Sequence, residues 1–224
     1  MAQAGIHGLV SLAVKKWAPG KEWLVLGIVL GGILPDTDNL GVAFATVAKL
    51  PIEGIHRTFT HSLFTIVVVV AVFYLVSLLT KQSRWRYLGW GLGAGILLHI
   101  LLDLIIWFNG VAILWPIPSW INFWQNVAPP VWFDKFMSPA EFLCFALFLY
   151  ALNSAARKGK TDSEYLSTLK IWTLLQAALL VIFTVLVYTM SKGFTTIFGA
   201  AYLLSLGLVV GITIRMRKTI EAAI

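Results

Sequence analysis

Residues His61 to Thr80 read HSLFTIVVVVAVFYLVSLLT, a run of aliphatic and aromatic side chains with no acidic or basic residue after the histidine. A helix needs about 20 predominantly apolar residues to cross the hydrocarbon core of a membrane, and this run has that length. Four further apolar runs of similar length follow it, at residues 87–109, 139–156, 171–190 and 194–214. The sequence therefore predicts an all-α, polytopic transmembrane helical bundle with about five long spans.

Two shorter apolar segments precede these runs, at residues 5–14 and 23–34, and Pro35 ends the second. Each is too short to cross a membrane by itself, which favours two short N-terminal helices packed inside the bundle as half-helices or re-entrant elements. We expect the whole chain, residues 1–224, to form a single membrane-embedded domain.

The composition excludes an ordinary soluble enzyme. Hydrophobic residues make up 59% of the chain and charged residues only 12%, about half the fraction that is usual in globular domains. The net charge of +7 could indicate nucleic-acid binding, but basic loops that face an anionic membrane leaflet explain it better. Single Cys144 excludes an intramolecular disulfide and is expected to be a small packed residue.

The loop charges predict an orientation. Thirteen of the 17 basic residues fall in loops that alternate along the chain, which places those loops on the cytoplasmic side, with the C-terminus, in a cytoplasmic (inner) membrane. The thirteen are Lys15, Lys16, Lys21, Lys81, Arg84, Arg86, Arg157, Lys158, Lys160, Lys170, Arg215, Arg217 and Lys218. The other four, Lys49, Arg57, Lys135 and Lys192, fall on the outer side.

The most polar stretch of the chain lies on that outer side, between Pro35 and His61. It carries two carboxylates, two imidazoles and a guanidinium, from Asp36, Asp38, His56, Arg57 and His61. Ionisable groups are costly next to lipid and usually mark a functional site in a membrane protein. The stretch therefore predicts one half of a metal site.

The local structure of this stretch is predicted from its proline and threonines. Asp36 and Asp38 follow Pro35, so we expect them on an irregular loop at the membrane surface, where plain solvation is the alternative to a ligand role. Thr58 or Thr60 is expected to be the N-cap of the helix that contains His61, with His56 on the incoming loop.

His99 and Asp103 predict the other half of the site. Their spacing of four residues puts both on one face of a helix, where an imidazole and a carboxylate can bind one divalent ion or bracket two. A buried histidine–aspartate hydrogen bond is the alternative. Carboxylates mixed with imidazoles favour zinc, with manganese or iron as alternatives, in a site of one or two ions.

Two further residues are weaker candidates for the metal site. His7 is a lone histidine on an apolar segment, for which a ligand role and a buried structural role are both open. Glu141 begins the predicted 139–156 span, so capping of a helix N-terminus is the favoured role and metal binding the minor one.

The order of these motifs resembles the YdjM-type membrane-bound metal-dependent hydrolases. The resemblance rests on His7, Leu34 to Asp38, His56 to Ser62, His99 to Asp103 and the Leu114-Trp115-Pro116 that follows. It covers about residues 1–150 and leaves residues 151–224 as two additional transmembrane helices. It implies a hydrolase in the cytoplasmic membrane, often linked to envelope or stress biology, whose metal ligands come from His7, Asp36, Asp38, His56, His61, His99 and Asp103.

The pattern is also similar, more distantly, to zinc-dependent phospholipase C and P1 nuclease. That likeness implies an Asp103 that bridges two metals, but the further histidines and the N-terminal amine that hold the third metal in that group have no counterpart. His-x-x-x-Asp closes a lipid-phosphatase signature as well, although the Ser-Arg and Ser-Gly-His that should precede it are absent.

The expected activity is hydrolysis of a phosphoester in a lipid or lipid-linked substrate by a metal-activated water. Arg57 is the expected phosphate-binding residue, with a headgroup-facing surface arginine as the alternative. The expected partners are membrane lipids and no nucleic acid. The rival functions are a metal transporter and an interaction protein with a structural metal. The aromatic connector at residues 110–139 is expected at the membrane interface, with a lid over the site as the alternative.

Overall fold

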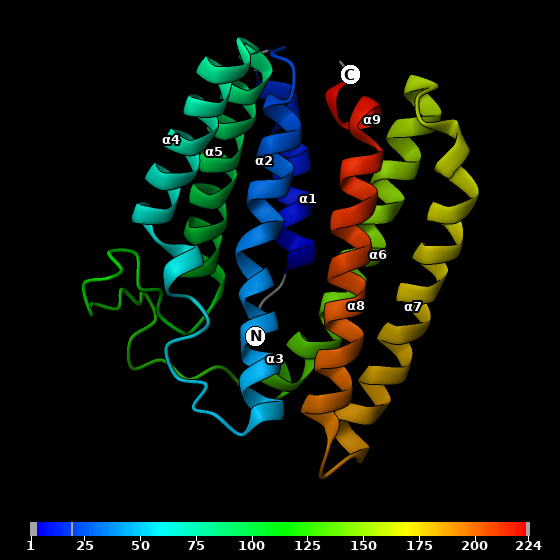
Figure 1. Cartoon of the computed structure of the whole chain (residues 1–224). Coiled ribbons are helices and arrows are strands. Elements are labelled where there is room, and N and C mark those ends of the chain that lie inside the picture. The colour runs from blue at the N-terminus through cyan, green and yellow to red at the C-terminus, as the bar shows by residue number, and fades with distance from the viewer. Residues whose placement is uncertain (1–3, 19, 223–224) are drawn as a thin grey trace.

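The structure is a computed structural model that describes residues 4–18 and 20–222, and all its regular elements are helices (Figure 1). An isolated β-bridge between Val111 and Ile121 holds the long connector together. The α-helices are α1 (Ala4–Val14), α2 (Leu24–Ile33), α3 (Asn39–Ala48), α4 (Leu63–Thr80), α5 (Ser83–Ile106), α6 (Val131–Gly159), α7 (Leu166–Thr189), α8 (Phe194–Arg215) and α9 (Arg217–Glu221). Short 3-10 turns are η1 (Lys15–Trp17), η2 (Leu34–Asp38), η3 (Phe59–His61) and η4 (Ser163–Tyr165).

Six helical segments are long and apolar enough to cross a membrane, which confirms the predicted all-helical transmembrane bundle. The sixth segment, in addition to the five predicted runs, is Leu24–Ala48, because the helical segment does not end at Pro35. It continues through η2 into α3 without reversing its direction (Figure 1). Pro35 occupies the first turn of η2, where a helix does not use the backbone N–H that proline lacks. Only α1 remains a short helix inside the bundle.

One predicted helix start was wrong and one was right in part. The α6 helix begins at Val131 and carries Pro139 in its interior, so the connector ends at Pro130. His61 lies in η3, whose N-cap is Thr58, one of the two predicted residues, but no side-chain hydrogen bond caps this turn. The α-helix that follows, α4, begins at Leu63, and its N-cap is Ser62, whose hydroxyl accepts a hydrogen bond from the Thr65 N–H.

The thirteen basic residues of the alternating loops lie at one end of the bundle, at the top of Figure 1. This end, which we call the basic end, contains the η1 loop, the α4–α5 turn, the α6–α7 turn and α9. The α3–α4 loop, the connector at residues 107–130 and the α7–α8 turn lie at the opposite end. The alternation predicted from the loop charges is therefore present in the fold.

Helices α2 and α5 pack closely through glycines. A Cβ atom added to Gly27 would lie 2.9 Å from the Gly91 Cα, and one added to Gly31 would lie 3.0 Å from the Gly95 Cα. These distances are shorter than real Cβ contacts, so the two backbones touch directly. The close approach brings the end of α2, which leads to Asp36, beside the α5 face that carries His99.

One hydrophobic core cluster joins the helices on both sides of α1 and includes residues of α2, α5, α6, α7 and α8. Within it the rings of Phe142, Phe183 and Phe198 contact one another edge-on or tilted, with centroids 5.0–5.8 Å apart. Cys144 is a free thiol beside Gly5 of α1, in agreement with its predicted packing role. This core holds α1, and with it His7, in the centre of the bundle.

Candidate metal centre

Four side chains meet inside the bundle, from η2, η3 and α5. His61 Nε2 lies 3.0 Å from His99 Nε2 and 3.8 Å from Asp36 Oδ1. Asp103 Oδ2 lies 3.6 Å from His61 Nε2 and 3.8 Å from His99 Nε2, and the distance from His99 Nε2 to Asp36 Oδ1 is 3.7 Å. Ligand atoms about 2.0 Å from a tetrahedral zinc are about 3.3 Å apart, so these five distances are close to those of one ligand set.

The hydrogen bonds of the two histidines assign their tautomers. The His99 Nδ1 atom lies 2.8 Å from the Gly32 carbonyl oxygen, which can only accept, so Nδ1 carries the proton. His61 Nδ1 lies 2.9 Å from the Thr60 hydroxyl, and that hydroxyl itself donates to Asp38. With the Thr60 proton donated to Asp38, His61 Nδ1 carries its ring proton and both Nε2 atoms present lone pairs to each other at 3.0 Å, a repulsion that an added proton or a metal ion between them would relieve.

Asp36 gives a second reason to expect a cation. Its side chain is fully buried, and neither carboxylate oxygen has a hydrogen-bond partner within the described residues. A buried carboxylate without a partner is strongly destabilising, and such groups are normally paired with a charge or bound to a metal. The residues present therefore fit a divalent ion held by Asp36, His61 and His99, with Asp103 on the remaining side.

Asp103 has two further neighbours besides His61 and His99. Its Oδ2 atom lies 3.2 Å from Arg57 Nε, and its Oδ1 atom lies 3.2 Å from His7 Nε2. The His7 ring stacks on the His99 ring with centroids 3.7 Å apart. His7 is thus brought to the site as predicted, but it faces the far oxygen of Asp103, where it either orients this carboxylate or binds a second ion.

Asp38 and His56 form an outer layer of the site. Asp38 accepts hydrogen bonds from the Thr60 hydroxyl at 2.8 Å and the Arg57 N–H at 3.2 Å, and it lies 2.8 Å from His56 Nδ1. It also lies 3.3 Å from His61 Nδ1, the ring nitrogen that faces away from the other three ligand atoms. Burial lowers the pKa of His56, although the nearby Asp38 carboxylate opposes that shift. These contacts indicate that Asp38 orients His61.

Two predicted locations were wrong. Asp36 is fully buried and Asp38 almost so, because η2 carries them within the Leu24–Ala48 span instead of leaving them on a surface loop. Glu141 lies within α6 and does not cap it. Its carboxylate accepts a hydrogen bond of 3.0 Å from the Gly5 N–H in the first turn of α1, so it caps a different helix from the one that carries it.

Arg57 is not a surface arginine, since its side chain is only 3% exposed. Its backbone has φ +62°, a left-handed conformation that is unfavourable for arginine and is typical of functional sites when the surroundings enforce it. The Arg57 carbonyl accepts a hydrogen bond from the Ala112 N–H, and Arg57 Nη1 donates to the Asn109 carbonyl at 3.3 Å. The connector therefore covers the loop that carries Arg57.

A pocket of about 400 Å³ opens beside this arginine, at the end of the bundle opposite the basic end. Trp107 and Asn109 line it, together with Asp134 and Lys135 of α6. The Arg57 guanidinium lies 5.7 Å from the centre of the Trp107 ring. Arg57 thus contacts Asp103 and two of the residues that line this pocket, Trp107 and Asn109.

Sequence reasoning missed the residues that act through their backbones or small side chains. Gly32 supplies the carbonyl for His99, and Thr60 supplies the hydroxyl for His61. Neither residue type signals a site by itself. Gly32 could have been suspected from the Gly31-Gly32 pair, which ends three positions before Pro35, since such a pair allows close backbone approach.

The family assignment follows from comparison with known proteins. The model of the family described as YdjM inner membrane protein matches residues 3–203. The chain belongs to the YdjM inner membrane protein family. Inner membrane protein YdjM of Escherichia coli (strain K12) is 32% identical over 177 residues, which cover 69% of this chain and 81% of that protein. The protein of the same name in Shigella flexneri matches with the same identity and coverage.

Membership of the YdjM family confirms the predicted resemblance, and with the apolar helices it supports a multi-pass inner-membrane location. The match extends beyond residue 150, where the recognised motifs end, and reaches into α8. No solved structure matches the chain. The likeness to zinc-dependent phospholipase C and P1 nuclease stays a prediction.

Proposed function

We propose that this protein is an integral membrane metal-dependent hydrolase that cleaves a phosphoester bond in a lipid or lipid-linked substrate. The observation that carries the proposal is the 3.0 Å approach of His61 Nε2 and His99 Nε2, both with their lone pairs directed inward, beside the unpartnered carboxylate of Asp36. Asp36, His61 and His99 would hold a divalent ion, zinc first and manganese or iron as alternatives. When bound, that ion would polarise the phosphoryl group and activate a water.

Asp103 is the proposed proton acceptor. Its Oδ2 atom lies beside both histidine Nε2 atoms, within reach of a water in the same space. His7 and Arg57 approach the two Asp103 oxygens from different sides and so fix the orientation of the carboxylate. Asp103 would take a proton from the attacking water and return it to the leaving oxygen of the substrate.

Arg57 is the proposed phosphate-binding residue. Its Nη2 atom is buried and has no hydrogen-bond partner within the described residues, so the guanidinium retains a free donor. A guanidinium binds phosphoryl oxygens through paired N–H groups and stabilises the charge that develops on them during cleavage. Its contacts with Asp103 and with Trp107 and Asn109 of the pocket lining suit a headgroup that enters from that pocket.

The end of the bundle that carries this pocket would face the extracytoplasmic side, because the positive-inside rule places the basic end in the cytoplasm. Exposed tryptophans, among them Trp120, Trp124 and Trp132, surround this end and suit a membrane interface. A lipid headgroup in the outer leaflet of the inner membrane would therefore lie at the depth of the site.

The proposal is tested by turnover. The full chain would be purified in detergent, loaded separately with zinc, manganese and iron, and assayed for headgroup or phosphate release from a panel of phospholipids and lipid-linked pyrophosphates. We expect turnover by the wild type and a loss of at least about 100-fold in His99→Ala and in Asp103→Asn. Lys192→Gln in the exposed α7–α8 turn is the control. Metal-loaded wild type that cleaves nothing in the panel would contradict a lipid phosphoesterase.

A second candidate function of the site is structural, with a metal ion that only stabilises the bundle. The observation in its favour is burial, since the side chains of Asp36, His61, His99 and Asp103 are at most 1% exposed, as in closed structural sites. In that case removal of the metal lowers the melting temperature, and metal-loaded protein shows no turnover. For the hydrolase, Asp103→Asn abolishes turnover while bound metal is retained.

A further inference from the structure

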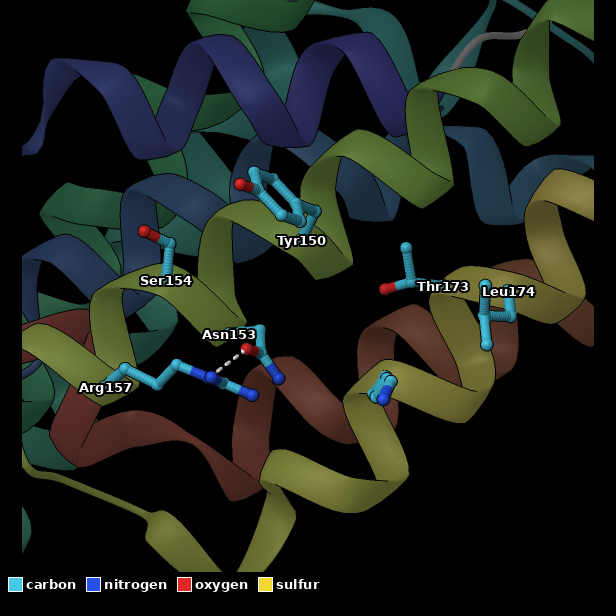
Figure 2. A pocket seen from close by; sticks show the side chains of 7 residues that line it. Tyr150, Asn153, Ser154, Arg157, Thr173 and Leu174 are labelled. Atoms are coloured by element: carbon cyan, nitrogen blue, oxygen red, sulfur yellow. Dashed lines mark hydrogen bonds between the residues drawn. The ribbon is translucent and has the colours of Figure 1, made fainter.

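A second polar pocket lies far from the metal centre, between α6 and α7 close to the basic end. It has a volume of about 380 Å³, and Figure 2 shows side chains of both helices around it. Tyr150, Asn153 and Arg157 come from α6, and Lys170 and Leu174 from α7. The proposed hydrolase chemistry uses none of these residues.

The pocket has two cations whose charge is not balanced. Neither Arg157 nor Lys170 forms an ion pair with a carboxylate anywhere in residues 4–18 and 20–222. Two positive charges that line one pocket without an acidic partner favour an anionic ligand.

The Arg157 side chain is also held in a defined position. Its Nε donates a 2.8 Å hydrogen bond to the Asn153 Oδ1 atom, as Figure 2 shows. The Asn153 amide in turn donates to the Leu166 carbonyl at 3.0 Å, which fixes it between the two helices. Because only Nε is used, the terminal Nη groups of Arg157 remain available for the paired hydrogen bonds that guanidinium makes to phosphate oxygens.

The polarity of the pocket changes with depth in the membrane. Arg157 and Lys170 lie near the ends of their helices, while Leu174 lies one turn further along α7 and Tyr150 about two turns further along α6. Tyr150 and Leu174 are 64% and 61% exposed, in a part of the bundle whose outer surface is apolar. A ligand with a charged head and an apolar body fits this arrangement, whereas a free anion would use only one end of it.

We propose that this pocket binds an anionic phospholipid of the leaflet at the basic end. Arg157 and Lys170 contact the phosphodiester, and the acyl chains lie along Tyr150 and Leu174. Basic pockets between transmembrane helices at the cytoplasmic surface recognise anionic headgroups in this way. The bound lipid would connect α7 to the rest of the bundle, since little of the α7 surface is buried in the protein.

The test is lipid binding to the full chain, measured by native mass spectrometry during titration with phosphatidylglycerol or phosphatidylcholine. The variant is Arg157→Gln with Lys170→Gln. The control is Lys81→Gln with Arg86→Gln, which removes the same charge from the α4–α5 side of the basic end. Each basic residue contributes about fivefold to anionic lipid binding, so we expect the tightest phosphatidylglycerol site to weaken by roughly 25-fold in the variant and by less than threefold in the control.

Two soluble competitors separate a lipid from a free phosphate. We expect neither inorganic phosphate nor glycerol 3-phosphate, at tenfold excess, to displace bound phosphatidylglycerol. Displacement by either anion would show that the pocket binds phosphate from solution and would overturn the lipid assignment. Equal weakening in variant and control would reduce the effect to general surface charge, and equal affinity for phosphatidylcholine would show that the pocket does not select an anionic headgroup. Either result would overturn the proposal. Because the pocket is independent of the metal centre, each of these outcomes leaves the hydrolase proposal unchanged.

Discussion

His61 Nε2 and His99 Nε2 face each other at 3.0 Å, while the other nitrogen of each ring is engaged by an oxygen. The Gly32 carbonyl, the Thr60 hydroxyl and the Asp38 carboxylate place the ring protons on the outer sides. An added proton or a metal ion between the two Nε2 atoms would relieve the repulsion of their lone pairs. The hydrogen bonds around the site therefore support the proposed divalent ion, as the positions of the ligand atoms do.

Removal of either inner histidine should abolish metal binding. We expect the wild type, purified and measured by inductively coupled plasma mass spectrometry, to retain a divalent metal, and His61→Ala and His99→Ala to retain less than about a tenth of it. His56→Ala is the matched control, because His56 Nδ1 is paired with Asp38 of the outer layer and the His56 ring meets the His61 ring only edge to face, with centroids 5.3 Å apart. Equal metal loss in His56→Ala would contradict the inner ligand set.

Asp38→Asn should weaken metal binding without abolishing it. The asparagine keeps the volume of Asp38 but loses the carboxylate charge that faces His61 Nδ1, and loss of such an outer partner typically costs 10- to 100-fold in metal affinity. The measurement is competition with a chelator of known affinity, with Asp134→Asn in the exposed first turn of α6 as the control. Metal loss as complete as in His99→Ala would instead make Asp38 a direct ligand.

Arg57→Lys and Arg57→Gly should retain metal but lose turnover. Lysine offers a point charge that cannot reach Asp103 and the Asn109 carbonyl together, and glycine keeps the left-handed backbone while removing the cation. We expect kcat to fall by about 100-fold or more in both, with a smaller change in KM, because the guanidinium stabilises charge that develops during cleavage. Unchanged kcat in the lysine variant would leave Arg57 a structural role only.

The sequence has three Gly-xxx-Gly motifs, Gly27/Gly31, Gly91/Gly95 and Gly207/Gly211, and alanine should be harmful in the first two and tolerated in the third. A Cβ at Gly31 would collide with the Leu92 carbonyl, and a Cβ at Gly95 with the Ile28 carbonyl. We expect Gly31→Ala and Gly95→Ala each to cost about 1–3 kcal/mol, seen as a melting temperature lower by about 2–10 °C in detergent. A Cβ added at Gly207 or Gly211 has no other heavy atom within 4 Å. Gly207→Ala and Gly211→Ala should therefore leave the melting temperature unchanged or raise it slightly. Destabilisation by all four would point to glycine flexibility in place of close packing.

The orientation can be tested by thiol labelling of intact cells. In a Cys144→Ala background, Asn126→Cys in the connector should react with a membrane-impermeant maleimide, and Lys160→Cys in the α6–α7 turn should react only after lysis. The reverse pattern would put the metal centre on the cytoplasmic side.

The sequence by itself determined the membrane class, the long spans and the residue types of the site. A run such as His61 to Thr80 can be stable only across a membrane, and rare ionisable groups in an apolar chain are conspicuous whatever their packing. The alternation of basic loops could also be predicted from the sequence, because the charge of a lysine or arginine does not depend on its neighbours. These features depend on local composition, so they needed no structure.

Only the tertiary structure decided which polar residue does what. Pro35 looked like a helix end, but packing of α2 on α5 through glycines carries the chain on and buries Asp36. Glu141 looked like the cap of its own helix, but it caps α1. The sequence could not predict this contact, because 136 residues separate Glu141 from Gly5. The division between inner ligands and the outer Asp38–His56 layer depends on which ring nitrogen faces which atom. Such distances between segments far apart in the chain arise only when the helices pack together.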